Sequence, residues 1–316
     1  MHFFIAPHSP EPLHIPDGFL NLVVSLICWA ITALTLSMAI SRTNKSLGEK
    51  QVPLMGIMAA FIFAAQMINF PVAGGTSGHL LGGALAAIVL GPWAGMLVMT
   101  AVIAVQALIL QDGGLLVMGA NILNMGLLTA AIGYGLYRSV SGSSRGAKLA
   151  VAGVAAWLSV MAGALATALQ LWLSGTSNLQ TVVIAMLGVH ALIALGEALI
   201  TVAALGFILQ TRPDLLDEKS VSAQGGRGWV VAGIFISLIV VLLSPFASAN
   251  PDGLERVAQD LGFISIAQDA PFQILPDYTV PFLGETSLST IVAGLIGALV
   301  VLGIAIFAAR SLQKKT

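Results

Sequence analysis

The sequence predicts an all-α polytopic membrane protein with about nine transmembrane helices, and two observations carry this prediction. The first is composition: 57% of the 316 residues are hydrophobic and 9% are charged, with a mean hydropathy of +0.96. A soluble domain carries about 25% charged residues, so this chain has too few charges for a surface that faces water. The second is a series of apolar runs near the length of about 20 residues that crosses a bilayer core.

These runs define the predicted spans in chain order. They lie near residues 19–41, 52–70, 80–91, 93–111, 117–137, 148–173, 181–209, 228–247 and 288–309. The third run is short, and the fourth begins almost at once across Gly91-Pro92-Trp93. A Gly-Pro pair interrupts a helix, so we predict either a tight helical hairpin or a partly re-entrant segment here.

The positive charges predict the orientation of the spans. Lys and Arg fall into four groups, within 42–50, 138–148, 212–227 and 310–315, and only Arg256 lies outside them. Nine spans with the N-terminus outside place all four groups in the cytoplasm, as the positive-inside rule requires. We therefore predict a multi-pass protein of the cell inner (plasma) membrane, surrounded by lipid, with a cytoplasmic C-terminus.

Four segments can be distinguished along the chain. Residues 1–12 form an N-terminal extension that lacks the basic start and apolar core of a signal peptide. Residues 13–210 form a compact membrane domain of about seven helices, followed by a charged cytoplasmic linker over 211–228. Residues 229–316 read as a helix, an acidic outer loop over 248–287 and a second helix. Long loops without periodicity are often functional, and we expect this one to concentrate cations or to gate their access.

Two histidine motifs predict a metal site. His14 lies in Leu13-His14-Ile15-Pro16-Asp17-Gly18, and His79 ends Gly74-Gly75-Thr76-Ser77-Gly78-His79, on loops predicted to face the same side. Imidazole is the commonest ligand for borderline divalent metals, although each histidine alone is equally well explained as a loop residue bonded to water or backbone. We find no cysteine cluster or third well-placed histidine to complete a tetrahedral zinc set. Backbone nitrogen or an amino terminus would then supply the other ligands, which favours square-planar nickel(II), copper(II) or cobalt.

Polar residues in and beside the spans suggest a supporting shell. Asn69, Gln106, Gln111, Asn121 and Asn124, with Gln66 and Asp112, cluster in spans two to five or at their outer ends, and Thr76 and Ser77 precede His79. They would either orient the two histidines or form hydrogen bonds between helices, worth about 0.6–2 kcal/mol each. Glu197, deep in a span, is expected to pair with His190 or another polar residue and so lock the bundle.

The sequence also excludes several functions. It has no G-x-x-x-x-G-K-[ST] motif, so we expect no ATP to bind this chain. It shows no catalytic constellation for an enzyme and no basic patch for nucleic acid. A stand-alone metal permease or channel, or a metal-sensing membrane protein that does not transport, stay open as alternatives to a transporter subunit.

The two histidine motifs together resemble a known family. L-H-I-P-D-G-F-L at 13–20 and N-F-P-V-A-G-G-T-S-G-H-L-L-G-G at 69–83 resemble the substrate-binding membrane subunit of cobalt/nickel energy-coupling factor transporters, the CbiM/NikM type. Pro251-Asp252-Gly253-Leu254-Glu255 resembles the PDGLE domain, similar to the two-helix CbiN/NikN-like accessory subunit. The resemblance implies that Co²⁺ or Ni²⁺ is the transported substrate. It also implies a CbiQ/NikQ-like transmembrane coupling subunit and CbiO/NikO-like cytoplasmic ATPases as partners.

The resemblance further implies which atoms bind the metal. They are the terminal amine of residue 13, the backbone nitrogen and imidazole of His14, and the imidazole of His79. This sequence departs from the family pattern because Leu13 stands where the family has an initiating Met, with twelve residues before it. Either the natural start is at Leu13, through a leucine codon that is read as methionine, or a protease removes residues 1–12. A third possibility is an amine site at Met1-His2, although the residues after His2 do not match the motif.

Overall fold

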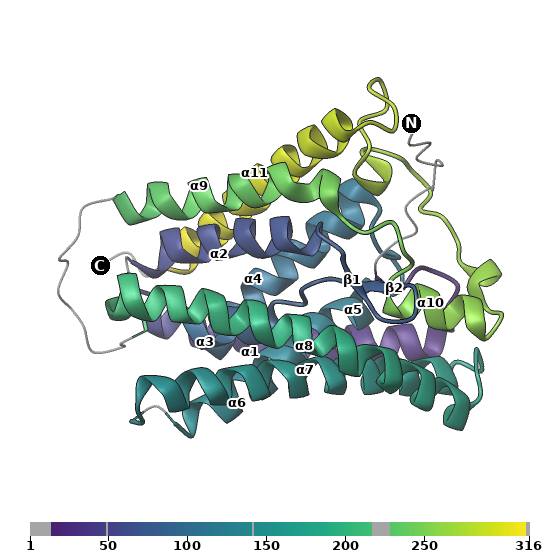
Figure 1. Cartoon of the computed structure of the whole chain (residues 1–316), viewed down its shortest axis with the longest axis horizontal. Coiled ribbons are helices and arrows are strands. Elements are labelled where there is room, and N and C mark those ends of the chain that lie inside the picture. The colour runs from purple at the N-terminus through teal and green to yellow at the C-terminus, as the bar shows by residue number, and fades with distance from the viewer. Residues whose placement is uncertain (1–13, 49, 141, 217–227, 314–316) are drawn as a thin grey trace.

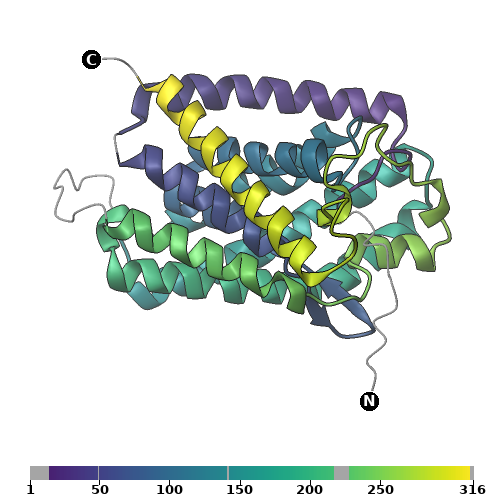
Figure 2. The same ribbon diagram turned by 90° about the horizontal axis from the view of Figure 1, so that it is seen from above.

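The structure is an elongated bundle of helices, seen from two sides in Figures 1 and 2. It is a computed structural model, and it describes residues 14–48, 50–140, 142–216 and 228–313. Among these residues, 6 helices have the length and apolar character to cross a membrane: Leu22–Lys45, Pro92–Leu110, Arg145–Leu173, Leu179–Thr211, Gly228–Phe246 and Ser287–Leu312. The predicted class of all-α polytopic membrane protein is thus confirmed, while the total of nine spans and their orientation stay predictions.

The helices follow one another along the chain with short connections. They are α1 (Leu22–Ser46), α2 (Gln51–Gln66), α3 (Gly83–Leu90), α4 (Pro92–Val105), α5 (Met118–Asn121), α6 (Thr129–Arg138), α7 (Arg145–Leu173), α8 (Leu179–Thr211), α9 (Gly228–Leu243), α10 (Gly253–Asp260) and α11 (Ser287–Leu312). The π-helical segment η1 (Gln106–Leu110) continues α4, and η2 (Ile122–Leu128) joins α5 to α6. Two short strands, β1 (Phe70–Val72) and β2 (Thr76–Gly78), form an antiparallel hairpin between α2 and α3.

Local sequence accounts for where these helices begin. The side chains of Asn21, Ser144, Asn178 and Thr286 each accept a hydrogen bond from a backbone N–H in the first turn of the helix that follows, because those first N–H groups have no partner within the helix. Gly91 takes a positive φ of 83° between α3 and α4, and Pro92 occupies the first position of α4. Helices α3 and α4 pack against each other, and whether the pair crosses the bilayer or forms a partly re-entrant segment stays a prediction.

Three segments differ from the sequence prediction. The second predicted span ends at Gln66 rather than at residue 70, because Phe70–Val72 pairs with Thr76–Gly78 as a strand. The third is an 8-residue helix, Gly83–Leu90, in which every residue is buried. The outer loop contains helix α10, whose first turn is closed by a reciprocal capping box between Asp252 and Glu255. A helix of 8 residues is too short to give a clear periodic signal.

The buried and exposed apolar side chains show where the core and the lipid-facing surface lie. Helices α3 and α4 form the centre, with α1, α2, α6 and α7 packed around them. The outer faces of α1, α8, α9 and α11 expose large apolar side chains, among them Leu34 at 68%, Leu199 at 72% and Phe307 at 74%. Exposed apolar surface on this scale is expected in lipid and is unusual in water.

The two ends of the bundle differ in character. The helix ends that carry the described residues of the four basic groups lie at the left end of the bundle in Figure 1: they are the C-terminal ends of α1, α6, α8 and α11 and the N-terminal ends of α2 and α7. The β-hairpin and α10 lie at the opposite end, and Figure 2 shows the same separation. One end is therefore basic, and the other holds the motifs that the sequence singled out.

The last two long helices pack on the rest of the bundle through α2. Both α9 and α11 contact α2, and α11 also contacts α4. Close approach of α11 requires glycine: a Cβ atom at Gly297 would overlap the ring of Phe63, and one at Gly294 would lie 2.6 Å from the Met67 methyl carbon. Small residues permit such contacts between helices in membranes.

We predict that Gly297→Val lowers the stability of the bundle. The added side chain has to displace Phe63, and overpacking of this kind costs about 1–3 kcal/mol. The measurement is thermal unfolding of the detergent-purified protein, followed by tryptophan fluorescence. Gly303→Val is the matched control, because a Cβ atom there meets nothing within 4 Å on the same helix. Equal melting temperatures for the two variants would contradict the described packing of α11 on α2.

Candidate metal centre

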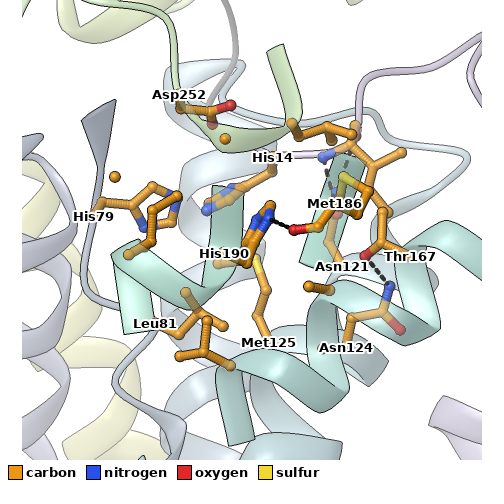
Figure 3. A pocket seen from close by; sticks show the side chains of 18 residues that line it. His14, His79, Leu81, Asn121, Asn124, Met125, Thr167, Met186, His190 and Asp252 are labelled. Atoms are coloured by element: carbon orange, nitrogen blue, oxygen red, sulfur yellow. Dashed lines mark hydrogen bonds between the residues drawn. The ribbon is translucent and has the colours of Figure 1, made fainter. Parts of the chain in front are cut away.

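Two imidazoles from distant parts of the chain meet at the hairpin end of the bundle. His14 precedes α1 and His79 directly follows β2, and their ring centroids lie 5.6 Å apart in an edge-to-face arrangement. The exposed fractions are 2% for His14 and 7% for His79. Both rings line a pocket that His190 of α8 and Asp252 also border (Figure 3). The two motifs that the sequence placed on one side therefore come together in one site.

The hydrogen bonds of the two rings leave one nitrogen of each directed to the pocket. Nδ1 of His14 donates to the backbone oxygen of Asp112 at 3.1 Å and lies 3.5 Å from the Asp112 carboxylate, whereas Nε2 is buried without a protein partner. Nδ1 of His79 donates to the backbone oxygen of Leu80 at 3.0 Å. Because a carbonyl only accepts, each Nδ1 carries a proton, and in a neutral ring Nε2 then keeps its lone pair. Histidines that bind metals show this same pattern, with the second ring nitrogen bonded to a carbonyl or carboxylate.

Burial keeps the His14 ring in its neutral form. Loss of hydration on burial is the main cause that lowers the pKa of His14 below its usual value, and the nearby Asp112 carboxylate partly opposes it. A neutral imidazole is the form that binds a metal ion. At neutral pH His14 is therefore ready to act as a ligand without first losing a proton.

Asp17 fixes the segment that carries His14. Its carboxylate accepts the backbone N–H groups of residues 115, 116 and 117 at 3.0, 2.9 and 3.1 Å. Asn121 bonds both backbone groups of Ile15, accepting from its N–H at 3.1 Å and donating to its C=O at 3.0 Å. Gly113, at φ 101°, leaves the space that His14 occupies, because a Cβ atom there would lie 2.9 Å from that of His14. The backbone on both sides of His14 is thus held in place.

Glu197 and Gln66 fix the segment that carries His79. The Glu197 carboxylate accepts the N–H groups of Leu81 at 2.6 Å and Gly82 at 2.9 Å, and Gln66 donates to the Leu81 carbonyl at 2.8 Å. Our expectation that Glu197 pairs with His190 or another polar side chain is wrong, because both of these bonds go to backbone amides. His190 instead donates from Nδ1 to the backbone oxygen of Met186 at 2.8 Å. Glu197 therefore holds the chain directly after His79.

The segment around Asp252, from the outer loop, covers the pocket. The Ser77 N–H donates to the Pro251 carbonyl at 2.8 Å, and the Ser77 hydroxyl donates to the Asn250 carbonyl at 2.8 Å. Gly253 lies directly against His190, because a Cβ atom there would stand 2.9 Å from Cε1 of that ring. The Asp252 side chain lines the pocket, and burial raises its pKa to about 7. Residues 252–254 thus form one wall of the site.

The other residues that the sequence singled out divide into three groups. Asn121 and Asn124 line the pocket, and Asn124 exchanges hydrogen bonds with Gln170. Thr76 and Ser77 are buried in β2, and Gln106 is buried between α4 and the outer loop. Asn69 and Gln111 do not line the pocket. The backbone oxygen of Asn69 accepts from the Ser248 N–H, and the side-chain oxygen of Gln111 accepts from the Ile274 N–H, both in the outer loop. Leu13 lies outside the described residues.

Three residues of the site escaped the sequence analysis. His190 is a third histidine at the pocket, and Asp252 was noted only as part of the PDGLE motif. Tyr278, from the outer loop, donates to the Asp112 carboxylate at 2.7 Å. The only signal for Tyr278 is its position in the predicted outer loop, which does not indicate a partner that lies 166 residues earlier. Among the described residues, no group of three His, Cys, Asp or Glu side chains lies close enough to hold a metal ion by itself.

Comparison with known proteins finds matches for both parts of the chain. The sequence model of the CbiM family, cobalt uptake substrate-specific transmembrane region, matches residues 14–215, and that of the PDGLE domain matches 227–314. A protein of Archaeoglobus fulgidus, provisionally named fused nickel transport protein NikMN, is 34% identical over 92% of this chain and 96% of its own length. The cobalt transport protein CbiM of Sorangium cellulosum is 34% identical over 66% of this chain and 96% of its own.

The fold has a counterpart among solved structures. The crystal structure of a transition metal transporter is 32% identical, covers 67% of this chain and all of the other, and gives a TM-score of 0.58.

We predict that Glu197→Gln loosens the segment after His79. Glutamine has nearly the same size, but its NH₂ group cannot accept from either of the two N–H groups that Glu197 now binds. An unsatisfied buried amide costs about 1–3 kcal/mol. The measurement is hydrogen exchange of the Leu81 and Gly82 amides, with faster exchange expected in the variant. Glu285→Gln, at an exposed position of the outer loop, is the control, and equal protection in both variants would contradict this role.

Proposed function

The chain belongs to the CbiM family of cobalt uptake substrate-specific transmembrane regions and is a membrane component of cobalt or nickel transport, and we propose that it is the metal-binding subunit of an ATP-driven importer of the energy-coupling factor type. The observation that carries this proposal is the pair His14 and His79, buried side by side with each Nδ1 bonded to a backbone carbonyl. The metal ion is the transported substrate, and we assign no catalysed reaction to the chain itself.

The proposed metal ligands are the imidazoles of His14 and His79, with the amine and backbone nitrogen at residues 13 and 14. The amine requires a chain that begins at residue 13, through initiation or cleavage there. Two imidazoles and two backbone nitrogens make a set that suits square-planar nickel(II) and also binds cobalt(II), since divalent metals differ at such a site mainly in the geometry they prefer. The cobalt family model and the nickel relative support the same two ions.

The proposed orientation places the metal site outside the cytoplasm, in the inner (plasma) membrane. The basic helix ends lie at the end of the bundle opposite the histidines (Figure 1), and basic loops are retained on the cytoplasmic side. We propose that a separate transmembrane coupling subunit and cytoplasmic ATPases, of the CbiQ/NikQ and CbiO/NikO types, bind at that basic end. Because no phosphate-binding loop motif occurs in the sequence, ATP hydrolysis is assigned to those partners.

We predict that His79→Ala abolishes high-affinity binding of nickel and cobalt while the protein still inserts in the membrane. The substitution removes one ligand and leaves the bundle intact, because His79 lies in the connection between β2 and α3. The measurement is isothermal titration of the purified protein with each metal, together with elemental analysis after growth in trace nickel and cobalt. Gln180→Ala, at an exposed position of α8 that does not line the pocket, is the control. Stoichiometric metal in His79→Ala would refute the site.

We predict that metal accumulation requires the ATPase partners. Cells that express this chain with the coupling subunit and ATPases are expected to accumulate radioactive nickel or cobalt, and a Walker-lysine variant of the ATPase is expected to abolish this, because that lysine contacts the β/γ-phosphates. Equal uptake by the chain alone would favour the permease alternative. Full metal binding without uptake beside active partners would favour a metal sensor.

A further inference from the structure

A chain of buried hydrogen bonds connects the two histidine segments through the outer loop. It runs from His14 to the Leu81 backbone, two residues after His79. Its links in order are Asp112, Tyr278, Gln106 and Gln66. Every side chain in it except Tyr278 belongs to the part of the chain that matches CbiM, and Tyr278 belongs to the part that matches PDGLE. The link supplied by the C-terminal part is therefore the central one.

The Tyr278 hydroxyl both donates and accepts a hydrogen bond within this chain of bonds. It donates to the Asp112 carboxylate at 2.7 Å and accepts from the Gln106 amide at 3.2 Å. The same amide nitrogen of Gln106 donates to the Gln66 side-chain oxygen at 2.9 Å. A hydroxyl has one proton to donate, and here that proton goes to the carboxylate. Tyr278 thus fixes which oxygen of Asp112 faces the outer loop and which faces His14.

Asp112 carries this constraint to His14. Its Oδ2 accepts from Tyr278, its Oδ1 lies 3.5 Å from Nδ1 of His14, and its backbone oxygen accepts from the same Nδ1 at 3.1 Å. Asp112 follows Gln111, which takes a left-handed φ of 55° at the end of the π-helical segment η1. Such a backbone persists only where the surroundings hold it. The carboxylate–histidine contact is the kind that orients metal-binding imidazoles.

The rest of the outer loop is anchored without the Tyr278 hydroxyl. Leu275 donates to the Ile109 carbonyl at 3.0 Å, and the Val280 N–H donates to the Ser289 hydroxyl at 2.6 Å. The Tyr278 ring also packs near Phe63, with centroids 6.2 Å apart. Removal of the hydroxyl alone leaves these contacts in place. The hydroxyl therefore has a role that can be tested apart from the folding of the loop.

We propose that Tyr278 is a positioning residue through which the C-terminal PDGLE part sets the orientation of His14 and thereby the metal affinity of the site in the CbiM part. This proposal deepens the proposed function and rests on His14 and His79 as metal ligands. Its chemical content is that Tyr278 orients the Asp112 carboxylate, and the carboxylate orients the imidazole. The tyrosine itself touches no metal ion.

The test is Tyr278→Phe in the full chain, with the dissociation constants of Ni²⁺ and Co²⁺ measured by titration. The loss of a partner that orients a ligand weakens metal binding by about 10–100-fold, and we expect a loss in that range. Tyr137→Phe removes a tyrosine hydroxyl from α6, outside the described pocket, and is expected to bind like the unaltered protein. An unchanged dissociation constant in Tyr278→Phe would overturn the proposal.

Two further measurements separate positioning from a general loss of structure. The visible spectrum of the cobalt(II) complex at saturation is expected to shift in Tyr278→Phe, because a reoriented imidazole changes the ligand field, whereas a mere loss of folded protein only lowers the intensity. The double variant Tyr278→Phe/Asp112→Asn is expected to lose no more affinity than the weaker-binding single variant, since both act through one link. Losses that multiply would overturn the proposal.

The same titrations distinguish the failure of this proposal from that of the proposed function. If the unaltered protein, tested from residue 1 and from residue 13, binds neither metal, the proposed function fails and the role of Tyr278 fails with it. If the unaltered protein binds metal and Tyr278→Phe binds equally well, only the role of Tyr278 is overturned.

Discussion

The structure depends on one physical constraint, which is that two imidazoles are buried side by side and one of them, His14, keeps a buried nitrogen without a protein partner. An unsatisfied polar group inside a protein costs about 1–3 kcal/mol, and Nε2 of His14 is such a group. Hydrogen bonds around the ring offset this cost. Asp17 and Asn121 bond the backbone of neighbouring segments, and the Asp112 carbonyl accepts from Nδ1 of His14. A site that is rigid in the absence of substrate loses little conformational freedom when the substrate binds.

The same constraint explains the irregular backbone at this end of the bundle. A membrane core accepts irregular backbone only where protein buries it, and strand β2, the short helix α3 and most residues of the π-helical segments are buried. The Leu81 amide and carbonyl, which have no helix partner, are both satisfied by side chains, Glu197 and Gln66. The acid deep in the membrane is therefore explained by the need to bind backbone amides, and it leaves the imidazoles free for metal.

Sequence reasoning predicted the parts of this protein that depend on local pattern. Apolar runs predicted the long helices, Gly91-Pro92 predicted the break between α3 and α4, and the two histidine motifs predicted the pair that the structure brings together. It missed the β-hairpin, α10 and the roles of Tyr278 and His190. The β-hairpin and α10 are too short to give a clear periodic pattern. The roles of Tyr278 and His190 depend on contacts between residues far apart in the chain, such as Tyr278 with Asp112, and a single sequence contains no signal for such pairs. Polarity alone also failed to separate Asn121, which bonds the segment of His14, from Gln111, which bonds the outer loop.

Fusion of the two parts has a thermodynamic consequence for the site. When the outer loop is tethered to the bundle, its segments bind as an intramolecular event and pay no cost of bringing two molecules together. If the seated loop raises metal affinity through Tyr278, then bound metal must stabilise the seated loop by the same factor, because the coupling between two binding events is reciprocal. Residues 252–254 line the pocket and Tyr278 bonds Asp112, so under this proposal both contacts belong to the loop whose seating the metal favours. Metal binding and seating of the loop over the pocket are then one coupled equilibrium. Any movement that lifts the loop therefore opens the pocket and lowers its metal affinity at the same time.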